Sequence, residues 1–304
     1  MKILIAGALG YDGAGLIDSY RENTADEIIL LDKRFVPYLL ADLPQQFRYV
    51  EGNILDKDLM KHLLKGVELV YLLAGEVEAE SSIERETSIW ENNYNGAVTL
   101  IENCSDDTHI IFASTGNIFG GVLESEKNTN LTELDEPRPK YPYAESKREV
   151  EKYLLKSTKN YTIVRFGTHY GYTPGIRFNL VTNLFFKKAM MGQDIHIHGS
   201  GDNYRPTLCA LDAIRAMRFL AMKPEASREI FHLIGNNYRI REIATEVKSV
   251  FPNIKIEHIL KEVPFNSYHL SSDKIKTLGF GFEWDIRRGI EEMKTIFSAL
   301  YCNK

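Results

Sequence analysis

Hydrophobic and polar positions alternate in two regular patterns along the first half of the chain. Short apolar runs predict buried strands at Lys2–Ala6, Ile28–Leu31, Phe47–Val50, Leu69–Leu73, His109–Ala113 and Tyr161–Phe166. Apolar residues at helical spacing lie between several of these runs and predict helices at Gly13–Tyr20, Lys57–Leu64, Ile89–Asn103 and Tyr143–Thr158. Strands that alternate with helices of this length indicate an α/β fold built on a doubly wound parallel sheet. Such a sheet binds its ligand at the carboxyl ends of its strands.

The pattern changes after Gly171, where Pro174 and Gly175 interrupt the chain. Beyond them we expect helices at Leu180–Met191, Leu211–Ala221 and Ile286–Leu300, and a short strand at Asp194–His198. No repeat or low-complexity linker separates the two halves. We therefore predict a first domain over residues 1–170 and a smaller C-terminal lobe over 171–304, with segments such as 208–233 packing back on the first domain.

The charge balance narrows the choice of partners. Lys and Arg number 37 against 42 Asp and Glu, which gives a net charge of −5 and argues against nucleic acid or an anionic membrane surface. No apolar segment is long enough to span a bilayer. The three cysteines, at 104, 209 and 302, have neither metal-ligand nor disulfide-framework spacing, which favours a reducing compartment. We expect a soluble cytoplasmic protein.

Histidines at 196 and 198 alternate with isoleucines in the short strand Asp194–His198. Their spacing raises the question of a metal site, but no cysteine or carboxylate partner accompanies them. We interpret them as the polar face of a strand and predict no metal.

A glycine turn follows the first predicted strand. Gly7, Gly10 and Gly13 are spaced G-x-x-G-x-x-G, so the backbone can approach a phosphate while the next helix directs its free amides at it. The glycines alone are a weak signal, and a plain strand-to-helix turn is the alternative. Asp32, at the end of the second strand, adds a group that binds adenosine ribose hydroxyls. A carboxylate there repels a 2′-phosphate, so NAD is favoured over NADP, although the adjacent Lys33 and Arg34 partly offset the repulsion.

Asp12 lies inside the glycine turn, where an inward-pointing carboxylate would repel a pyrophosphate. An acidic residue in the first turn of a helix can also interact with the dipole and cap free amides. We predict that Asp12 points away from the phosphates, and that Asp12→Ile leaves NAD binding unchanged or tightens it.

Tyr143 and Lys147 are four residues apart on a predicted helix and so share one face. A nearby ammonium lowers the pKa of a phenol and makes it a better proton acceptor. Ser114 and Thr115, at the carboxyl end of the fifth strand, supply hydroxyls for the reacting oxygen. On its own, Y-x-x-x-K is common by chance, and an exposed helix pair is the alternative.

Taken together, GALGYDG, Asp32, NNYNG, FASTGNIFG, YAESK and RFGTHYG resemble the extended short-chain dehydrogenase/reductases. Along nearly its whole length the chain is similar to the NAD-dependent nucleotide-sugar epimerase/dehydratase family within them. The resemblance implies a Rossmann-like NAD-binding domain, a lobe that binds a nucleoside-diphosphate sugar, and a homodimer paired through a four-helix bundle. It assigns catalysis to Thr115, Tyr143 and Lys147, and gives Lys147 a hydrogen bond to the nicotinamide ribose.

The resemblance also implies two sets of binding residues. The expected cofactor contacts are Gly7, Gly10, Tyr11, Asp12, Gly13, Asp32, Asn53, Ile54, Leu73, Ala74, Gly75, Asn93, Tyr143 and Lys147. The expected substrate contacts are Glu76, Ser81, Thr115, Thr168, Arg177, Asn183 and Arg205, with Arg205 as a diphosphate clamp. Asn53, Phe119 and Thr168 depart from the family's usual Asp, Tyr and Asn.

Two residues that differ from the family pattern reduce the number of possible reactions. Nucleotide-sugar 4,6-dehydratases usually carry an acid pair where this chain has Gly116 and Asn117, which disfavours elimination. We expect an NAD-dependent epimerase acting at C4, with a 4-dehydrogenase or keto-sugar reductase as the alternative. A non-catalytic NAD-sensing protein and a dehydrogenase of hydrophobic alcohols are further alternatives, and the retained Tyr143–Lys147 pair and Arg205 respectively argue against them.

Overall fold

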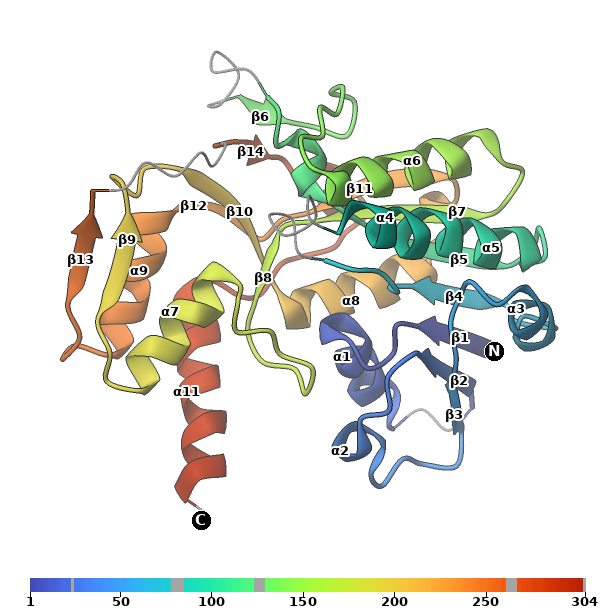
Figure 1. The fold of residues 1–304 in the computed structure, drawn as a ribbon, viewed down its shortest axis with the longest axis horizontal. Helices are drawn as coiled ribbons and strands as arrows, with labels where there is room; N and C mark the ends of the chain where they lie inside the picture. The colour runs from blue at the N-terminus through green and yellow to red at the C-terminus, as the bar shows by residue number, and fades with distance from the viewer. Residues whose placement is uncertain (23–24, 78–84, 123–128, 261–266, 303–304) are drawn as a thin grey trace.

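A seven-stranded parallel sheet forms the centre of the molecule (Figure 1). The computed structural model describes residues 1–304 except 23–24, 78–84, 123–128, 261–266 and 303–304. The spatial strand order is β11-β7-β5-β4-β1-β2-β3. The strands are β1 (Lys2–Ala6), β2 (Glu27–Asp32), β3 (Phe47–Glu51), β4 (Leu69–Leu72), β5 (His109–Thr115), β7 (Tyr161–Phe166) and β11 (Glu229–Leu233). This order confirms the doubly wound α/β fold, and its switch point lies between β1 and β4.

Helices cover both faces of this sheet because its strands are apolar on both sides (Figure 1). On β1, Ile3 and Ile5 pack into the layer that holds α1 and α8, whereas Leu4 and Ala6 pack into the layer that holds α3, α5 and α6. The bounds are α1 (Tyr11–Tyr20), α8 (Ala210–Ala221), α3 (Lys57–Leu63), α5 (Gly96–Asn103) and α6 (Pro142–Lys156), with short α2 (Pro37–Leu40) and α10 (Asp273–Thr277) beside the first layer.

The helix predicted at Ile89–Asn103 is not continuous. It begins with α4 (Glu86–Ile89), passes through a π-helical segment at Trp90–Asn95 and continues as α5. One extra residue in a turn re-aims the side chains it carries, and such segments are frequent at functional sites. Here the segment carries Asn92 and Asn93 toward the loop after β4.

A second lobe has a core of its own (Figure 1). It is built from α7 (Val181–Met190), α9 (Ile240–Val250), α11 (Ile286–Cys302) and the parallel pair β9 (Ile195–His198) and β13 (Ile256–Ile259). A three-stranded sheet of β8 (Thr168–Tyr170), β10 (Tyr204–Cys209) and β12 (Asn236–Arg239) and a small pair of β6 (Asn130–Leu131) and β14 (His269–Leu270) complete the described strands. The apolar pattern did not single out α9.

The segment that follows β10 returns to the central sheet. Helix α8 packs on α1, and β11 extends the sheet by pairing with β7. Residues 210–233 therefore pack with the central sheet and α1, although they follow the start of the second lobe in sequence.

A buried ionic network ties α6 to the middle of the sheet. The carboxylate of Glu151 accepts two hydrogen bonds from the Arg165 guanidinium, at 3.0 and 2.9 Å, one from Ser114 Oγ at 2.6 Å and one from Arg148 at 2.9 Å. Glu151 is fully buried and Arg165 is 1% exposed. Burial first, and then the Arg165 charge, lowers the pKa of His232 to about 3, so a neutral His232 faces the guanidinium at 3.3 Å.

Glu151→Gln should destabilise the fold by about 3 kcal/mol, because it leaves the Arg165 guanidinium buried without a carboxylate. Equilibrium urea denaturation measures the free energy of unfolding. Glu149→Gln is the matched control on the same helix, since Glu149 forms an exposed pair with Lys152 that should contribute less than about 1 kcal/mol. Equal losses in the two variants would contradict the assignment.

Candidate functional site

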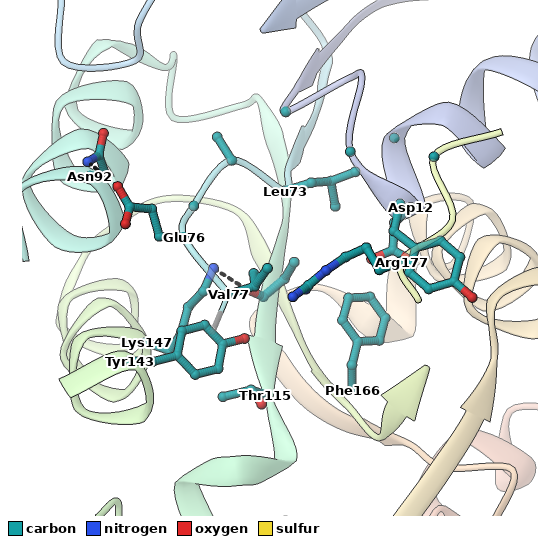
Figure 2. A pocket seen from close by; sticks show the side chains of 18 of the residues that line it. Asp12, Leu73, Glu76, Val77, Asn92, Thr115, Tyr143, Lys147, Phe166 and Arg177 are labelled. Carbon is teal, nitrogen blue, oxygen red and sulfur yellow. Dashed lines mark hydrogen bonds between the residues drawn. The ribbon is translucent and has the colours of Figure 1, made fainter. Parts of the chain in front are cut away.

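The described residues enclose a cavity of about 620 Å³ at the carboxyl ends of the central strands. Its walls come from the turn after β1, the ends of β2 and β4, helix α6 and the segment that leads into the second lobe. Figure 2 shows Tyr143, Lys147 and Thr115 on one side, Asp12 and Phe166 on another, and Arg177 extending toward the middle.

The glycine turn shapes the wall at the switch point. Gly7 has φ +86°, and a Cβ there would lie 2.7 Å from the Ala74 backbone nitrogen. A Cβ on Gly13 would lie 2.4 Å from the Gly7 carbonyl oxygen, so only glycine lets α1 start this close to β1. Helix α1 begins at Tyr11, and its cap residue Gly10 provides no side-chain hydrogen bond. The first-turn amides are therefore available to an anion, and the turn fits a pyrophosphate.

Asp32 connects the end of β2 to this turn. Its Oδ2 accepts a hydrogen bond from the Leu9 amide at 2.9 Å, and its Oδ1 accepts from the Arg34 amide at 3.0 Å and Arg34 Nε at 3.2 Å. The carboxylate is 6% exposed and still lines the cavity, together with Asn53 and Ile54. An acid that is partly neutralised by Arg34 at this position fits an adenosine ribose.

The loop after β4 is held by the π-helical segment. Asn93 accepts from the Glu76 amide at 2.7 Å and donates to the Glu76 carbonyl oxygen at 2.9 Å. The Glu76 carboxylate accepts from Asn92 at 2.9 Å and pairs with Arg85 at 3.3 Å. Glu76 thus lines the cavity with its charge already compensated by protein groups.

Tyr143, Lys147 and Thr115 meet in the cavity as the spacing on α6 predicts. Lys147 is 2% exposed, donates to the Ala113 carbonyl oxygen at 2.8 Å and lies 5.0 Å from the Phe112 ring centre. Burial lowers the pKa of Lys147 from 10.5 to about 8. Thr115 Oγ1 also accepts from the Asn117 amide at 3.1 Å, which orients the hydroxyl at the strand end.

The Tyr143 phenol is buried, and that burial raises its pKa. A hydrogen bond with Thr115 and the charge of Arg177 act in the opposite direction, while the charge of Asp12 raises the pKa further. Burial is the largest of these effects, so the net pKa of the phenol lies above its ordinary value of about 10 and the group is protonated at neutral pH.

Asp12 contacts His169 instead of capping α1. Asp12 Oδ1 and His169 Nε2 are 2.9 Å apart, but the contact lacks the alignment of a hydrogen bond, and neither atom has another partner among the described residues. Among the described residues no hydrogen bond joins the Asp12 carboxylate to the amides of its own turn, so the alternative that Asp12 caps these amides gains no support. Its orientation relative to a bound pyrophosphate remains a prediction.

Of four further predicted substrate residues, two line the cavity and two do not. Arg177 and Thr168 are among its lining residues. Asn183 is fully buried outside it, where its amide donates to Tyr11 Oη at 2.9 Å and to the Arg177 carbonyl oxygen at 3.0 Å. Arg205 also lies outside the lining and donates to the Tyr204 carbonyl oxygen at 3.3 Å.

Comparison with known proteins agrees with this geometry. Residues 3–235 match the NAD dependent epimerase/dehydratase family. The chain belongs to this family. That membership confirms the resemblance to extended short-chain dehydrogenase/reductases drawn from the motifs.

Named relatives of this family member cover more than one activity. A trifunctional UDP-glucose 4,6-dehydratase/UDP-4-keto-6-deoxy-D-glucose 3,5-epimerase/UDP-4-keto-L-rhamnose-reductase of Arabidopsis thaliana is 27% identical over 96% of this chain, and this chain spans only 45% of its length. A putative UDP-glucose 4-epimerase of Methanocaldococcus jannaschii is 25% identical over 96% of both chains. The solved structure of a dTDP-glucose 4,6-dehydratase from Streptomyces venezuelae with NAD bound has a TM-score of 0.84 at 22% identity, covering 97% of each chain.

Most of the cofactor residues expected from the sequence of this epimerase/dehydratase family member lie together in the structure. The members of that set that line the cavity are Gly7, Gly10, Tyr11, Asp12, Gly13, Asp32, Asn53, Ile54, Leu73, Ala74, Gly75, Tyr143 and Lys147. Asn93 does not line it and instead positions the loop at Glu76. Ser81 lies outside the described residues.

Several cavity residues were not expected from sequence. Tyr268 reaches in from the C-terminal part and donates to Asn117 Oδ1 at 2.9 Å. Burial raises the pKa of Tyr268 to about 12. His169 and Phe166 come from the RFGTHYG motif, in which Phe166 ends β7 and His169 lies in the next strand, β8.

Two predicted absences can be compared with the described part of the chain. Within it, no helix is long and apolar enough to cross a membrane, and no group of three or more His, Cys, Asp or Glu is arranged to hold a metal ion. His196 pairs with Glu257 at 3.2 Å on the parallel strands β9 and β13.

Lys147→Met should stabilise the protein without cofactor by about 2 kcal/mol at pH 7. A folded-state pKa of about 8 against 10.5 means that holding the charged amine in the fold costs about 3 kcal/mol, and losing the bond to Ala113 offsets about 1. Between pH 8 and 10.5 the folded protein loses this proton before the unfolded chain does, so wild-type stability rises and the difference shrinks. Urea denaturation of both proteins at pH 7 and at pH 10 measures this difference in the free energy of unfolding.

Lys152→Met is the control for that measurement, because Lys152 lies on the solvent side of the same helix. It should change the free energy of unfolding by less than about 0.5 kcal/mol. A destabilising Lys147→Met at pH 7 would show that the buried ammonium stabilises the fold.

Proposed function

We propose that the chain is an NAD-dependent nucleotide-sugar epimerase that acts at C4 by removing a hydride and returning it to the other face. The observation that supports this most is the meeting of Tyr143, Lys147 and Thr115 in one cavity with the uncapped start of α1 and Asp32. A proton acceptor for an alcohol and a cradle for a dinucleotide thus share one space.

NAD, when bound, supplies the hydride acceptor. Thr115 orients the C4 hydroxyl of the sugar, and the Tyr143 phenolate takes its proton as the carbon–hydrogen bond breaks. The Lys147 ammonium stabilises that phenolate and binds the nicotinamide ribose, a role that its position beside Tyr143 on α6 supports. After the keto sugar turns over, Tyr143 returns the proton to the oxygen.

Elimination of water is disfavoured by the residues that follow Thr115. Gly116 has no side chain, and the side-chain amide oxygen of Asn117 accepts a hydrogen bond from the Tyr268 hydroxyl at 2.9 Å. An amide can serve neither as a general acid nor as a general base at neutral pH. We therefore propose an epimerase and not a dehydratase, the activity that the names of several relatives give.

The proposed substrate is a nucleoside-diphosphate sugar, in keeping with the UDP- and dTDP-sugars in the relatives' names. Arg177, which extends into the cavity in Figure 2, is the cation best placed to meet a diphosphate. Arg205 remains a second candidate, since its charge acts on the cavity residue Tyr268. For the cofactor, Asp32 favours NAD over NADP, with Arg34 weakening that preference.

We also propose that the protein is a homodimer, paired through α4–α5 and α6. The outer surfaces of these helices carry half-buried Trp90 and Tyr94, which contact each other, and exposed Leu155. Aromatic and aliphatic groups at such positions favour association with a second copy.

The alternative function is a 4-dehydrogenase or keto-sugar reductase on the same site. It follows from the same residues, because the machinery for hydride transfer does not decide whether the keto sugar stays bound. A panel of UDP-, dTDP- and GDP-sugars incubated with and without added NAD distinguishes the two. Inverted product in NMR spectra without net NADH indicates the epimerase, and stoichiometric NADH indicates the dehydrogenase. No turnover and no NAD binding would refute both.

Tyr143→Phe should lower kcat by about 100-fold or more, the size of a lost general base, without a comparable loss of NAD affinity. Tyr141→Phe is the control, since Tyr141 lies at the start of the same helix and does not line the cavity. Steady-state kinetics with the best sugar of the panel, together with calorimetric NAD binding, gives both values. Full activity of Tyr143→Phe would overturn the assignment.

A further inference from the structure

The position of the Arg177 guanidinium depends on the backbone that carries it. Arg177 lines the cavity and extends toward its middle (Figure 2). Asp12 lies beside Arg177 in the same figure, but among the described residues the Arg177 side chain forms no ion pair and no hydrogen bond, with Asp12 or with any other residue. A long side chain without such contacts is aimed chiefly by its own segment of backbone.

One buried amide closes the loop that ends at Arg177. Residues 171–177 form this arginine loop. At its start the Gly171 amide donates to Asn183 Oδ1 at 3.2 Å, and at its end the Arg177 carbonyl oxygen accepts from Asn183 Nδ2 at 3.0 Å. Asn183 lies on α7, is fully buried and also donates from Nδ2 to Tyr11 Oη at 2.9 Å. A side chain with one acceptor and two donor hydrogens thus joins both ends of the loop to the first residue of α1.

The arginine loop lies directly on the glycine turn. Thr173 is 2% exposed, and its Oγ1 donates to the Tyr11 carbonyl oxygen at 2.8 Å. A Cβ on Gly175 would lie 2.3 Å from the Gly10 carbonyl oxygen, so the two backbones are in contact without a side chain between them. Buried contacts between the loop and the turn therefore fix the separation of the Arg177 backbone from the turn that fits a pyrophosphate.

We propose that Asn183 is a positioning residue that aims Arg177 at the diphosphate of the substrate. The inference rests on the proposed function, in which the substrate is a nucleoside-diphosphate sugar and Arg177 is the cation that meets it. A guanidinium binds phosphate oxygens through two parallel hydrogen bonds, so a small displacement of the backbone that carries it lowers the affinity. Asn183 lies outside the cavity lining, so it acts on the substrate through Arg177 and not by contact.

Calorimetric titration of UDP and of dTDP into the full-length protein, saturated with NAD, measures this effect. Asn183→Ala removes its hydrogen bonds to the loop and to Tyr11, and should raise Kd for the tighter nucleotide by about tenfold, the size of one weakened charge-assisted contact. Arg177→Met should raise this Kd by at least as much. In the double variant Asn183→Ala should add less than about twofold, because no guanidinium is left to aim. Asp12 is present in every variant, so its charge cancels in this cycle.

Thr182→Val is the matched control, because Thr182 is the neighbouring residue on α7, is fully buried and has a hydroxyl without a hydrogen-bond partner among the described residues. It should leave Kd for the nucleotide and Kd for NAD within about twofold of wild type. If thermal melts show that Asn183→Ala does not fold, Thr173→Val and Thr173→Ser replace it. Valine loses the bond to Tyr11 and should weaken nucleotide binding about threefold, whereas serine keeps the hydroxyl and should not.

Three results would overturn the inference and leave the hydride-transfer function intact. They are an unchanged nucleotide Kd in Asn183→Ala, an equal weakening of NAD binding in that variant, and a further loss of about tenfold in the Arg177→Met background. In the replacement pair, equal weakening by valine and serine at Thr173 has the same meaning. Wild-type protein that binds NAD but neither UDP nor dTDP would instead refute the nucleoside-diphosphate substrate of the proposed function.

Discussion

The buried pairing of Glu151 with Arg165 is the constraint on which the site depends. Tyr143, Lys147 and Glu151 are spaced four apart on α6 and face the sheet together. Glu151 fixes the helix to Arg165 on β7 and Ser114 on β5, so that the preceding turns bring Lys147 to the Ala113 carbonyl oxygen and Tyr143 to Thr115. Removing either charge of a buried pair leaves the other without compensation, which is why such a contact enforces one helix position.

A second set of contacts joins the glycine turn to the second lobe. Tyr11 donates its hydroxyl hydrogen to the Gly171 carbonyl oxygen and accepts from Asn183, while Thr173 donates to the Tyr11 carbonyl oxygen at 2.8 Å. These bonds are buried, so separating the lobes would leave polar groups unpaired. Asn183, expected at a phosphate, thus positions a residue of the turn that would hold one.

Two polar groups in this cavity are buried at a cost to the stability of the fold. Lys147 is charged where burial disfavours charge, and Asp12 lies 2.9 Å from the His169 imidazole without an aligned hydrogen bond. Structures keep such groups where chemistry needs them, at a cost in stability. Lys147, Asp12 and His169 all line the cavity that Tyr143 also lines.

The sequence by itself determined the sheet, the turn and the helix that carries Tyr143 and Lys147. Apolar runs bounded the strands almost to the residue, because strands buried on both faces admit few polar side chains, and the four-residue spacing placed phenol and amine on one face. Only the tertiary structure decided which polar groups found partners. Asp12 contacts His169, which lies 157 positions away in the chain. Asn117 accepts a hydrogen bond from Tyr268, and Asn183 donates one to Tyr11 outside the cavity. Local periodicity reports which face of an element is buried, whereas the partner of a buried polar atom depends on segments that meet only after the chain has folded.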